Sequence, residues 1–591
     1  MLTAIPRERV HPAGRVKSLV PPSIRKQPVS VTVLQALDQP ALFRFADENT
    51  GAGLSERERR LLVGALNFHS LMAPGRTLRV HLYDGTPETF PRLTDDSTFD
   101  GMSRFNRHRL ESFEITSTVV SETRAVEASE ALSTALVEST TRHLHVSSDA
   151  VLSYDPYQPP RRGLIGGLAR RVKARAPLFY DDLRDLALLR HRRRLNTPVI
   201  PRTYEAEFLP GGAHEDDVIV PAAPAPEGAT KAVILGLHWF QLGGAEIWAF
   251  EAVRLVREAG FLPIVLSNRA SHQPWITRAE LDGALVIPFS EPTVDSQTPG
   301  IEQLLRALLR TFDVRGVVVH HNQWLYDRLA WIAASRPGIP IVDSTHIVEY
   351  TGGGYPLSSA IAANAISTHH VISPSLARWM TEVQGVPADR VVMAPLGGLT
   401  VEPKDAVFRP RVEGEPFTVA FIGRMARQKA PEVFVAMAAR LKRQGFRLRF
   451  IMHGDGELAG WVDDVIAAEG MTADIVRRTS ATPVTETLDE AHVLVVSSHN
   501  EGLTLTTLEA ITHGVPVVST DVGAQRDVIP AAALAPRYAH RGSRRLAELV
   551  APLIDDETAR EALWRKERKA EKKLLSQPSA SSWFKEEVSS W

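Results

Sequence analysis

The chain has no cysteine among its 591 residues, so disulfide bonds, a thiolate nucleophile and a cysteine-ligated zinc site are excluded. No run of about 18 apolar residues is present, and no membrane-spanning helix is expected. Residues 1–18 lack the apolar centre of a secretory signal peptide. Lysine plus arginine (68) almost equals aspartate plus glutamate (69), which gives no overall reason to expect nucleic acid as a partner. These absences are typical of a cytoplasmic protein.

A chain of this length is too long for one hydrophobic core, and its composition divides it. Polar stretches with proline at 211–230 and 401–416 are predicted to be linkers. Residues 231–400 and 417–555 alternate short apolar strands with helical segments, a pattern typical of parallel β-α-β units. We therefore expect an α/β protein with two tandem Rossmann-like domains, followed by C-terminal helices over 556–591. The expected strands are 232–237, 262–267, 284–288, 314–320, 339–344, 370–373, 417–422, 448–453, 492–497 and 515–519.

The N-terminal part, residues 1–210, carries no catalytic motif. Residues 78–83 read as a strand, and Ser55 with Glu58 forms a capping box before a helix. Residues 124–144 are rich in alanine, glutamate and leucine and predict a further helix. This part is therefore expected to be an α+β accessory region of unknown role.

A basic amphipathic segment covers residues 163–195. Such a segment can lie on an anionic membrane, which predicts peripheral contact with the inner face of the membrane. The alternative is a solvated surface helix whose cations sit near its C-terminal end, where the helix dipole favours them.

The most informative stretch runs from 497 to 518. A short apolar strand precedes Glu501 and Gly502, and a helix that carries Glu509 follows from Thr504 to Gly514. In an open parallel sheet, ligands bind at the carboxyl ends of the strands. The pattern therefore places Glu501 where a site is expected, although two solvated glutamates on an ordinary strand, loop and helix would also fit the spacing.

This stretch resembles the signature of the retaining glycosyltransferases of family 4, also described as glycosyl transferases group 1. The resemblance lies in Glu501-Gly502, Glu509-Ala510, the 514–518 run Gly-Val-Pro-Val-Val and Gly523. It implies a GT-B fold, in which two Rossmann-like domains face a cleft that holds the site. The family often has Phe-Gly or Leu-Pro after its Glu-Gly, where this chain has Leu503-Thr504.

A pair of cations follows the first expected strand of the second domain. Arg424 comes directly after Gly423, and Lys429 lies five residues further on. The resemblance implies that both side chains hold the donor diphosphate. Two fixed cations stabilise the negative charge of a leaving diphosphate without a metal. We expect no metal and no cofactor.

The resemblance also assigns roles to the remaining motif residues. Gly243 and Gly244 belong to a glycine loop that approaches the phosphates. His346 hydrogen-bonds the donor sugar, and Gly454 lies in a turn near the nucleotide. Where the family often has a glycine-containing segment, this chain has Arg-Arg-Thr-Ser at 477–480, which leaves the contacts to the base open.

The glutamate pair and its neighbours complete the implied donor site. The peptide N–H groups around Gly502, Leu503 and Thr504 face the diphosphate, and Glu509 binds the ribose. Glu501 contacts the donor sugar and acts by positioning and electrostatics rather than as a covalent nucleophile.

We therefore predict a retaining glycosyltransferase that moves a sugar from a nucleotide-sugar donor, such as a UDP- or GDP-sugar, to an acceptor hydroxyl. The acceptor is a glycan, a lipid-linked molecule or a small molecule, and the expected role is the synthesis of cell-surface glycans or glycoconjugates. Two alternatives stay open. One is a GT-B sugar-nucleotide epimerase, and the other is a non-catalytic module that binds sugar nucleotides or glycans.

Overall fold

The computed structural model describes residues 39–45, 53–85, 91, 108–120, 140–149, 152, 176, 221–241, 243–269, 271–289, 303–350, 353–399 and 406–591. Apart from Ala176, the segment 163–195 for which we predicted membrane contact lies outside these residues. Within the described part of the chain, no helix is both long enough and apolar enough to cross a bilayer.

The first Rossmann-like domain is built on a parallel sheet of seven strands in the order β11-β10-β9-β8-β5-β6-β7. Helices cover both faces of a parallel sheet, so its central strands read as continuous apolar runs. In β5, for example, every residue except Lys231 is buried. The strands are β5 (Lys231–Leu237), β6 (Leu262–Ser267), β7 (Leu285–Pro288), β8 (Asp313–His320), β9 (Ile341–Thr345), β10 (Thr368–Val371) and β11 (Val391–Met393). The helices are α6 (Gly244–Glu258), α7 (Gln303–Thr311), α8 (Gln323–Tyr326), α9 (Leu329–Ser335), α10 (Gly354–Ile361) and α11 (Pro374–Arg378).

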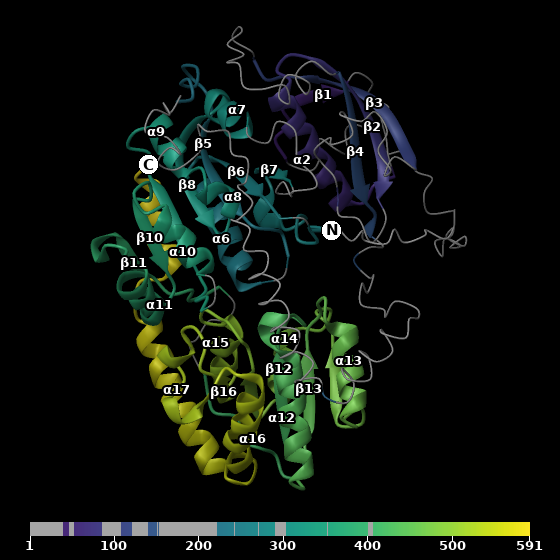
Figure 1. The fold of residues 1–591 in the computed structure, drawn as a ribbon, viewed down its shortest axis with the longest axis vertical. Coiled ribbons are helices and arrows are strands. Elements are labelled where there is room, and N and C mark those ends of the chain that lie inside the picture. The colour runs from purple at the N-terminus through teal and green to yellow at the C-terminus, as the bar shows by residue number, and fades with distance from the viewer. Residues whose placement is uncertain are drawn as a thin grey trace, which may run out of the picture.

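The second Rossmann-like domain has a parallel sheet of six strands in the order β14-β13-β12-β15-β16-β17. Figure 1 shows it below the first domain, with the carboxyl ends of its strands turned toward that domain. The strands are β12 (Thr418–Ile422), β13 (Arg449–His453), β14 (Ile475–Arg478), β15 (Val493–Val496), β16 (Val517–Thr520) and β17 (Leu534–Ala535). The helices are α12 (Pro431–Arg443), α13 (Ala459–Ala468), α14 (Val484–Glu490), α15 (Leu505–Thr512) and α16 (Ala539–Asp555).

Two further helices join the domains. The long helix α17 (Glu557–Leu575) packs on α15 and α16 of the second domain, and α18 (Ala580–Ser589) packs on α6 of the first (Figure 1). The Trp583 ring stacks on His370 of β10, with ring centroids 4.9 Å apart. The chain thus returns from the second domain to the first.

The N-terminal region forms its own sheet of four strands in the order β1-β3-β2-β4, beside the first domain in Figure 1. Its strands are β1 (Phe43–Phe45), β2 (Thr77–Gly85), β3 (Arg109–Ser117) and β4 (Thr141–Ser147). The helix α2 (Glu56–Met72) begins at the predicted capping box of Ser55 and Glu58. It packs between this sheet and the edge strand β7, where a Cβ on Gly64 would lie 2.8 Å from the Val286 carbonyl oxygen.

The helix predicted over residues 124–144 is wrong at its end. Residues 141–144 belong to β4, which pairs in parallel with β2. Buried and half-buried residues alternate at the start of β4, because one face of this sheet packs on α2. Tertiary pairing thus overrides the local composition there. Residues 121–139 lie outside the described part of the chain.

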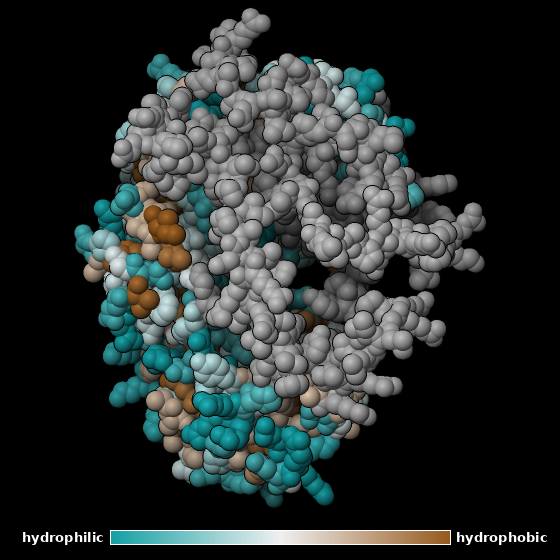
Figure 2. Space-filling model, viewed as in Figure 1, coloured by the Kyte–Doolittle hydropathy of each residue, from teal (hydrophilic) through white to brown (hydrophobic). Residues whose placement is uncertain are grey.

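Figure 2 shows few strongly apolar side chains among the residues that it colours. One group lies at the left, over the part of the first domain where α10 and β10 lie in Figure 1. On α10, Leu357 and Ile361 are 40% and 68% exposed and lie one helical turn apart. This surface is small compared with the polar surface around it.

Candidate functional site

The two Rossmann-like domains touch through their backbones at the predicted site. Gly502 follows β15 and His346 follows β9, and a Cβ on Gly502 would lie 1.6 Å from the His346 carbonyl oxygen. Next to this contact, the Val348 N–H donates to the Glu501 carbonyl oxygen at 3.1 Å. Only glycine fits at position 502. The structure therefore brings Glu501 and His346, predicted from separate motifs, to one place.

The Glu501 carboxylate is buried and paired. Its exposed fraction is 4%, and Oε1 accepts hydrogen bonds from Lys429 Nζ and Ser498 Oγ, each at 2.6 Å. Lys429 reaches this carboxylate from the short turn that follows β12. The predicted cation and the predicted carboxylate thus form one ion pair.

The predicted Arg424 extends across the boundary between the domains. Its guanidinium carbon lies 5.3 Å from the ring centroid of Trp239, which follows β5 in the first domain. Arg427, the third cation of this motif, donates to Glu432 of its own domain at 2.6 Å. Arg424 therefore contacts the first domain, whereas Lys429 pairs with Glu501 of its own domain.

Two helix N-termini meet in front of these cations. Gly243 is the N-cap of α6, and a Cβ on Gly244 would lie 3.2 Å from Leu505 Cδ1 in the first turn of α15. Thr504 caps α15 by accepting the Thr507 N–H at 3.3 Å, and Leu503 before it is buried. Free N–H groups at helix N-termini favour anions. The arrangement suits a diphosphate between the glycine loop and α15.

The predicted Gly454 lies against the backbone that carries Arg424. Its φ is +134°, and a Cβ there would lie 2.2 Å from the Gly423 carbonyl oxygen. Gly456, two residues on, is equally tight, because its Cβ would lie 2.6 Å from the Met425 carbonyl oxygen. This turn therefore supports the start of the cation motif. Glu509 lies half-buried in the second turn of α15.

The proton positions around His346 follow from its neighbours. His370 Nε2 lies 2.9 Å from the Ala394 carbonyl oxygen, which only accepts, so Nε2 carries the proton and Nδ1 of the neutral ring accepts. Ser344 Oγ lies 2.7 Å from that Nδ1 and must donate to it. Ser344 also accepts the Trp248 indole N–H at 2.9 Å. Because the one hydroxyl proton of Ser344 goes to His370, Ser344 Oγ can only accept from His346 Nε2, which lies 2.8 Å away. His346 therefore carries its proton on Nε2.

The remaining nitrogen of His346 is thereby an acceptor. Nδ1 is buried and has no hydrogen-bond partner among the described residues. Burial and the neighbouring histidines hold the pKa of His346 well below its ordinary value, which keeps the ring neutral. Nδ1 is therefore an acceptor that no described residue uses.

This tautomer predicts how two substitutions should differ. An asparagine side chain places an amide oxygen near the position of Nδ1, whereas a glutamine places its amide near Nε2. His346→Asn should therefore retain about tenfold more kcat/KM than His346→Gln, the effect of about one hydrogen bond. His346→Gln should be the more stable variant, because it can keep the contact to Ser344. Steady-state kinetics and melting temperatures check both; a more active glutamine variant would contradict the tautomer.

Buried histidines surround the carboxyl ends of β8, β9 and β10. Burial lowers the pKa of His320 to about 3 and the pKa values of His321 and His370 to about 4. His321 has a left-handed backbone (φ +55°), stacks on Tyr355 at 4.5 Å and accepts the His346 backbone N–H at 3.1 Å. The rings of His320 and His321 both lie next to His346.

These histidines should make the protein sensitive to acid. Between pH 6.5 and 4 the unfolded chain binds protons that the folded histidines do not, so stability falls as the pH falls. The pKa of Glu246, which burial raises to about 7, acts in the opposite direction over this range. Both ring nitrogens of His320 lack hydrogen-bond partners among the described residues, so His320→Leu should be tolerated. It should lessen the loss of unfolding free energy between pH 7.5 and 5 by about 2 kcal/mol. Urea unfolding at both pH values measures this, and equal losses in variant and parent would contradict it.

Two residues of the site could not be singled out from their motifs. Trp239 shows no distinguishing signal beyond its position after a strand, and Glu246 reads as a residue of the first helical turn. In the structure Glu246 is 4% exposed, and Oε1 accepts the Trp239 indole N–H at 2.8 Å. Glu246 therefore holds the ring on which Arg424 rests.

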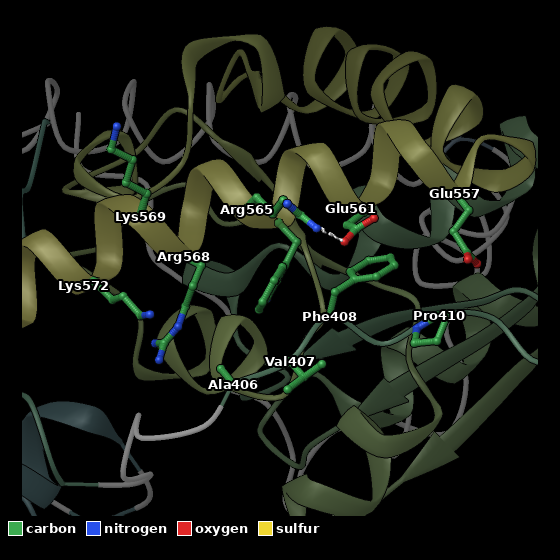
Figure 3. A pocket seen from close by; sticks show the side chains of 11 residues that line it. Ala406, Val407, Phe408, Pro410, Glu557, Glu561, Arg565, Arg568, Lys569 and Lys572 are labelled. Carbon is green, nitrogen blue, oxygen red and sulfur yellow. Dashed lines mark hydrogen bonds and ion pairs between the residues drawn. The ribbon is translucent and has the colours of Figure 1, made fainter.

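A cavity of about 790 Å³ lies away from this site, where the segment after 405 runs along α17 (Figure 3). Phe408 and Trp564 are among the residues that line it. In Figure 3 the side chains of Arg568 and Lys572 point down beside Ala406 at one end, and Glu557 lies at the other. None of the predicted site residues lines this cavity.

Comparison with known proteins agrees with this architecture. Residues 416–556 match the family described as glycosyl transferases group 1, and residues 242–397 match glycosyltransferase family 4. The two matches fall on the two Rossmann-like domains. The fold and site thus define a GT-B glycosyltransferase. The chain belongs to family 4 of these enzymes, and the family and fold expected from the sequence are confirmed.

Individual relatives are distant. A D-inositol 3-phosphate glycosyltransferase of Thermobispora bispora is 25% identical over 360 residues, which cover 53% of this chain and 82% of the relative. One from Nocardia farcinica is 28% identical over 320 residues, covering 48% and 70%. The solved structure of Anabaena Alr3699/HepE in complex with UDP-glucose aligns with a TM-score of 0.47 at 14% identity, covering 61% of this chain and 98% of that one.

Proposed function

We propose that this glycosyltransferase moves a sugar from a nucleotide-sugar donor to an acceptor hydroxyl with retention of anomeric configuration. The observation that supports it most is the meeting of Arg424, the Lys429–Glu501 pair and the N-termini of α6 and α15 at the contact between the domains. A leaving nucleoside diphosphate gains negative charge as the sugar departs. Fixed cations and helix N-termini aimed at that charge stabilise the transition state.

The proposed reaction uses the diphosphate as the proton acceptor. The donor sugar lies beside His346 and Glu501, and the diphosphate lies between Arg424, Lys429 and the first turn of α15. The bond from the anomeric carbon to the diphosphate breaks, and the acceptor oxygen bonds to that carbon on the same face. Its proton passes to the departing diphosphate oxygen. Glu501 positions the sugar, while Glu509 holds the ribose.

Metal ions have no part in the proposed mechanism. Among the described residues, no group of three His, Asp or Glu side chains could hold a metal ion. The two cations supply the positive charge that a divalent ion supplies elsewhere.

The names of the relatives indicate which acceptor to test first. The relatives are named for D-inositol 3-phosphate, so a phosphorylated polyol is the first acceptor to test. Glycan and lipid-linked acceptors, as expected for the synthesis of cell-surface glycoconjugates, are the next.

The decisive experiment has two stages. A thermal-shift screen with UDP-glucose, UDP-N-acetylglucosamine and GDP-mannose should raise the melting temperature for one of them, because a ligand of the folded state stabilises it. Turnover of that donor is then followed with and without an acceptor, and with and without EDTA. We expect a glycoside to form only when an acceptor is present, at a rate that EDTA does not change. NMR should show that the glycoside keeps the donor's anomeric configuration.

An isomerised sugar formed without acceptor would instead indicate an epimerase, and binding without turnover would indicate a binding module. Loss of activity in EDTA with recovery on adding Mg²⁺ or Mn²⁺ would contradict the metal-free mechanism.

A further inference from the structure

One aromatic ring of the first domain supports a cation of the second. Trp239 lies two residues after β5, and Arg424 lies two residues after β12. The guanidinium carbon of Arg424 is 5.3 Å from the indole centroid, a distance at which a cation is attracted to the face of the ring. The head of Arg424 thus rests on a residue of the opposite domain.

The indole itself is held in one orientation. Its N–H donates to Glu246 Oε1 at 2.8 Å, and the same oxygen lies 3.0 Å from His238 Nε2. Glu246 is 4% exposed and sits in the first turn of α6. Rotation of the ring would leave a buried carboxylate without one of its donors, which is costly.

The base of the Arg424 side chain is also fixed. A Cβ on Gly456 would lie 2.9 Å from Arg424 Cγ, so the turn at 454–456 packs against it. The Met425 N–H donates to the Asp455 carbonyl oxygen at 2.8 Å and anchors the next residue. Arg424 is therefore held at its base by its own domain and at its head by Trp239.

Support by a ring differs from support by a carboxylate. A salt bridge occupies the N–H groups of a guanidinium, whereas an aromatic face attracts the cation and leaves them available. The Arg424 Nε is buried and has no hydrogen-bond partner among the described residues. Lys429, in contrast, already donates to Glu501. Arg424 can therefore bind an incoming anion without first giving up a partner.

A second guanidinium lies near the same ring. The carbon of Arg269, which follows β6, is 5.2 Å from the Trp239 centroid. Two like charges near one ring repel each other, and an anion that binds to both relieves that repulsion. The placement of Arg269 and Arg424 beside Trp239 thus has its lowest free energy when negative charge is present in the cleft.

We propose that Trp239 is a positioning residue for the donor diphosphate, and that its indole, oriented by Glu246, presents the N–H groups of Arg424 to the leaving phosphate. This inference rests on the proposed function, because it assumes a nucleoside diphosphate in the cleft. It assigns part of the donor site to the domain that otherwise serves the acceptor.

The test measures how strongly the site distinguishes a diphosphate from a monophosphate. Calorimetric titration gives the dissociation constants of UDP and UMP, or of GDP and GMP if the guanine nucleotides bind more tightly. Trp239→Leu should reduce the preference for the diphosphate about tenfold, the effect of losing one cation–π contact at a partly desolvated site. Trp239→Phe keeps an aromatic face and should lose less. Trp275→Leu is the matched control, because Trp275 carries Arg278 at 5.3 Å within the first domain. It should leave the preference unchanged.

A double-mutant cycle separates this role from a general effect on folding. In an Arg424→Ala background, Trp239→Leu should cause no further loss of diphosphate preference, because the cation that it positions is gone. In a Lys429→Ala background it should still cause about a tenfold loss. Equal losses in the parent and in Arg424→Ala would overturn the proposal. If the parent binds no nucleoside diphosphate at all, the result contradicts the proposed function, and this inference, which depends on it, is also wrong.

Discussion

Arg424→Ala should lower kcat/KM by a factor that corresponds to about 2–4 kcal/mol of transition-state stabilisation, with the fold intact. Arg424 is half-buried at the boundary between the domains and has no carboxylate partner among the hydrogen bonds of the described residues. Its removal therefore breaks no hydrogen bond to a carboxylate among the described residues. The loss should appear in kcat as well as KM, because the charge on the diphosphate grows toward the transition state. Steady-state kinetics with the donor found by thermal shift measures both.

Lys429→Ala should show a second effect that Arg424→Ala lacks. It removes the cation from a carboxylate that is 4% exposed, leaving Ser498 as the other side-chain donor at Glu501 Oε1. We expect the unfolding free energy to fall by about 1–3 kcal/mol in addition to the loss of turnover. Lys442→Ala is the control, since Lys442 pairs with Asp474 at the same 2.6 Å on the surface. It should change neither quantity measurably. Wild-type turnover in both Arg424→Ala and Lys429→Ala would refute the diphosphate assignment.

Gly502→Ala should inactivate the enzyme by moving the domains apart. The new Cβ would lie 1.6 Å from the His346 carbonyl oxygen, and the backbone on both sides must shift by more than 1 Å to relieve the clash. A displacement of this size at the reacting centre costs about a hundredfold in rate. It also strains the hydrogen bond from Val348 to Glu501.

Gly397→Ala is the appropriate comparison for this substitution. A Cβ at Gly397 would meet only the end of the Leu575 side chain, at 3.2 Å, and a flexible side chain can give way. We expect nearly normal kcat/KM in this variant. Small-angle X-ray scattering of Gly502→Ala should show a larger radius of gyration than that of the parent. Normal activity in Gly502→Ala would mean that this contact is absent from the working enzyme.

Much of the central fold was predictable because strands in parallel sheets have a simple apolar pattern. Each of the ten predicted strands overlaps a strand of the structure. Three strands of these two sheets were missed, and each is short and lies at the edge of its sheet. β11 (Val391–Met393) has three residues, β14 (Ile475–Arg478) ends in two arginines, and β17 (Leu534–Ala535) has two residues. Their pairing is decided by neighbouring strands and not by their own composition.

The candidate site was predictable only as separate pieces. Motifs place Glu501 and His346 after strands, but the contact of Gly502 with His346 depends on how two domains meet. No local pattern encodes that geometry. Trp239 and Ser344 were missed for the same reason, since each acts through a partner far away in the sequence. The roles of the motif residues at the donor stay predictions until they are tested.

The position of α18 connects the C-terminal part of the chain to the histidines at the contact between the domains. Trp583 stacks on the ring of His370, whose Nδ1 accepts the Ser344 hydroxyl proton and so decides which nitrogen of His346 carries its proton. The ring of Trp583 shields this relay from water, which would offer the histidines other partners. A change at the surface of α18 can therefore alter the acceptor strength of one nitrogen in the site without touching the substrate. Through the ring of Trp583, α18 thus supports the hydrogen-bond arrangement behind His346.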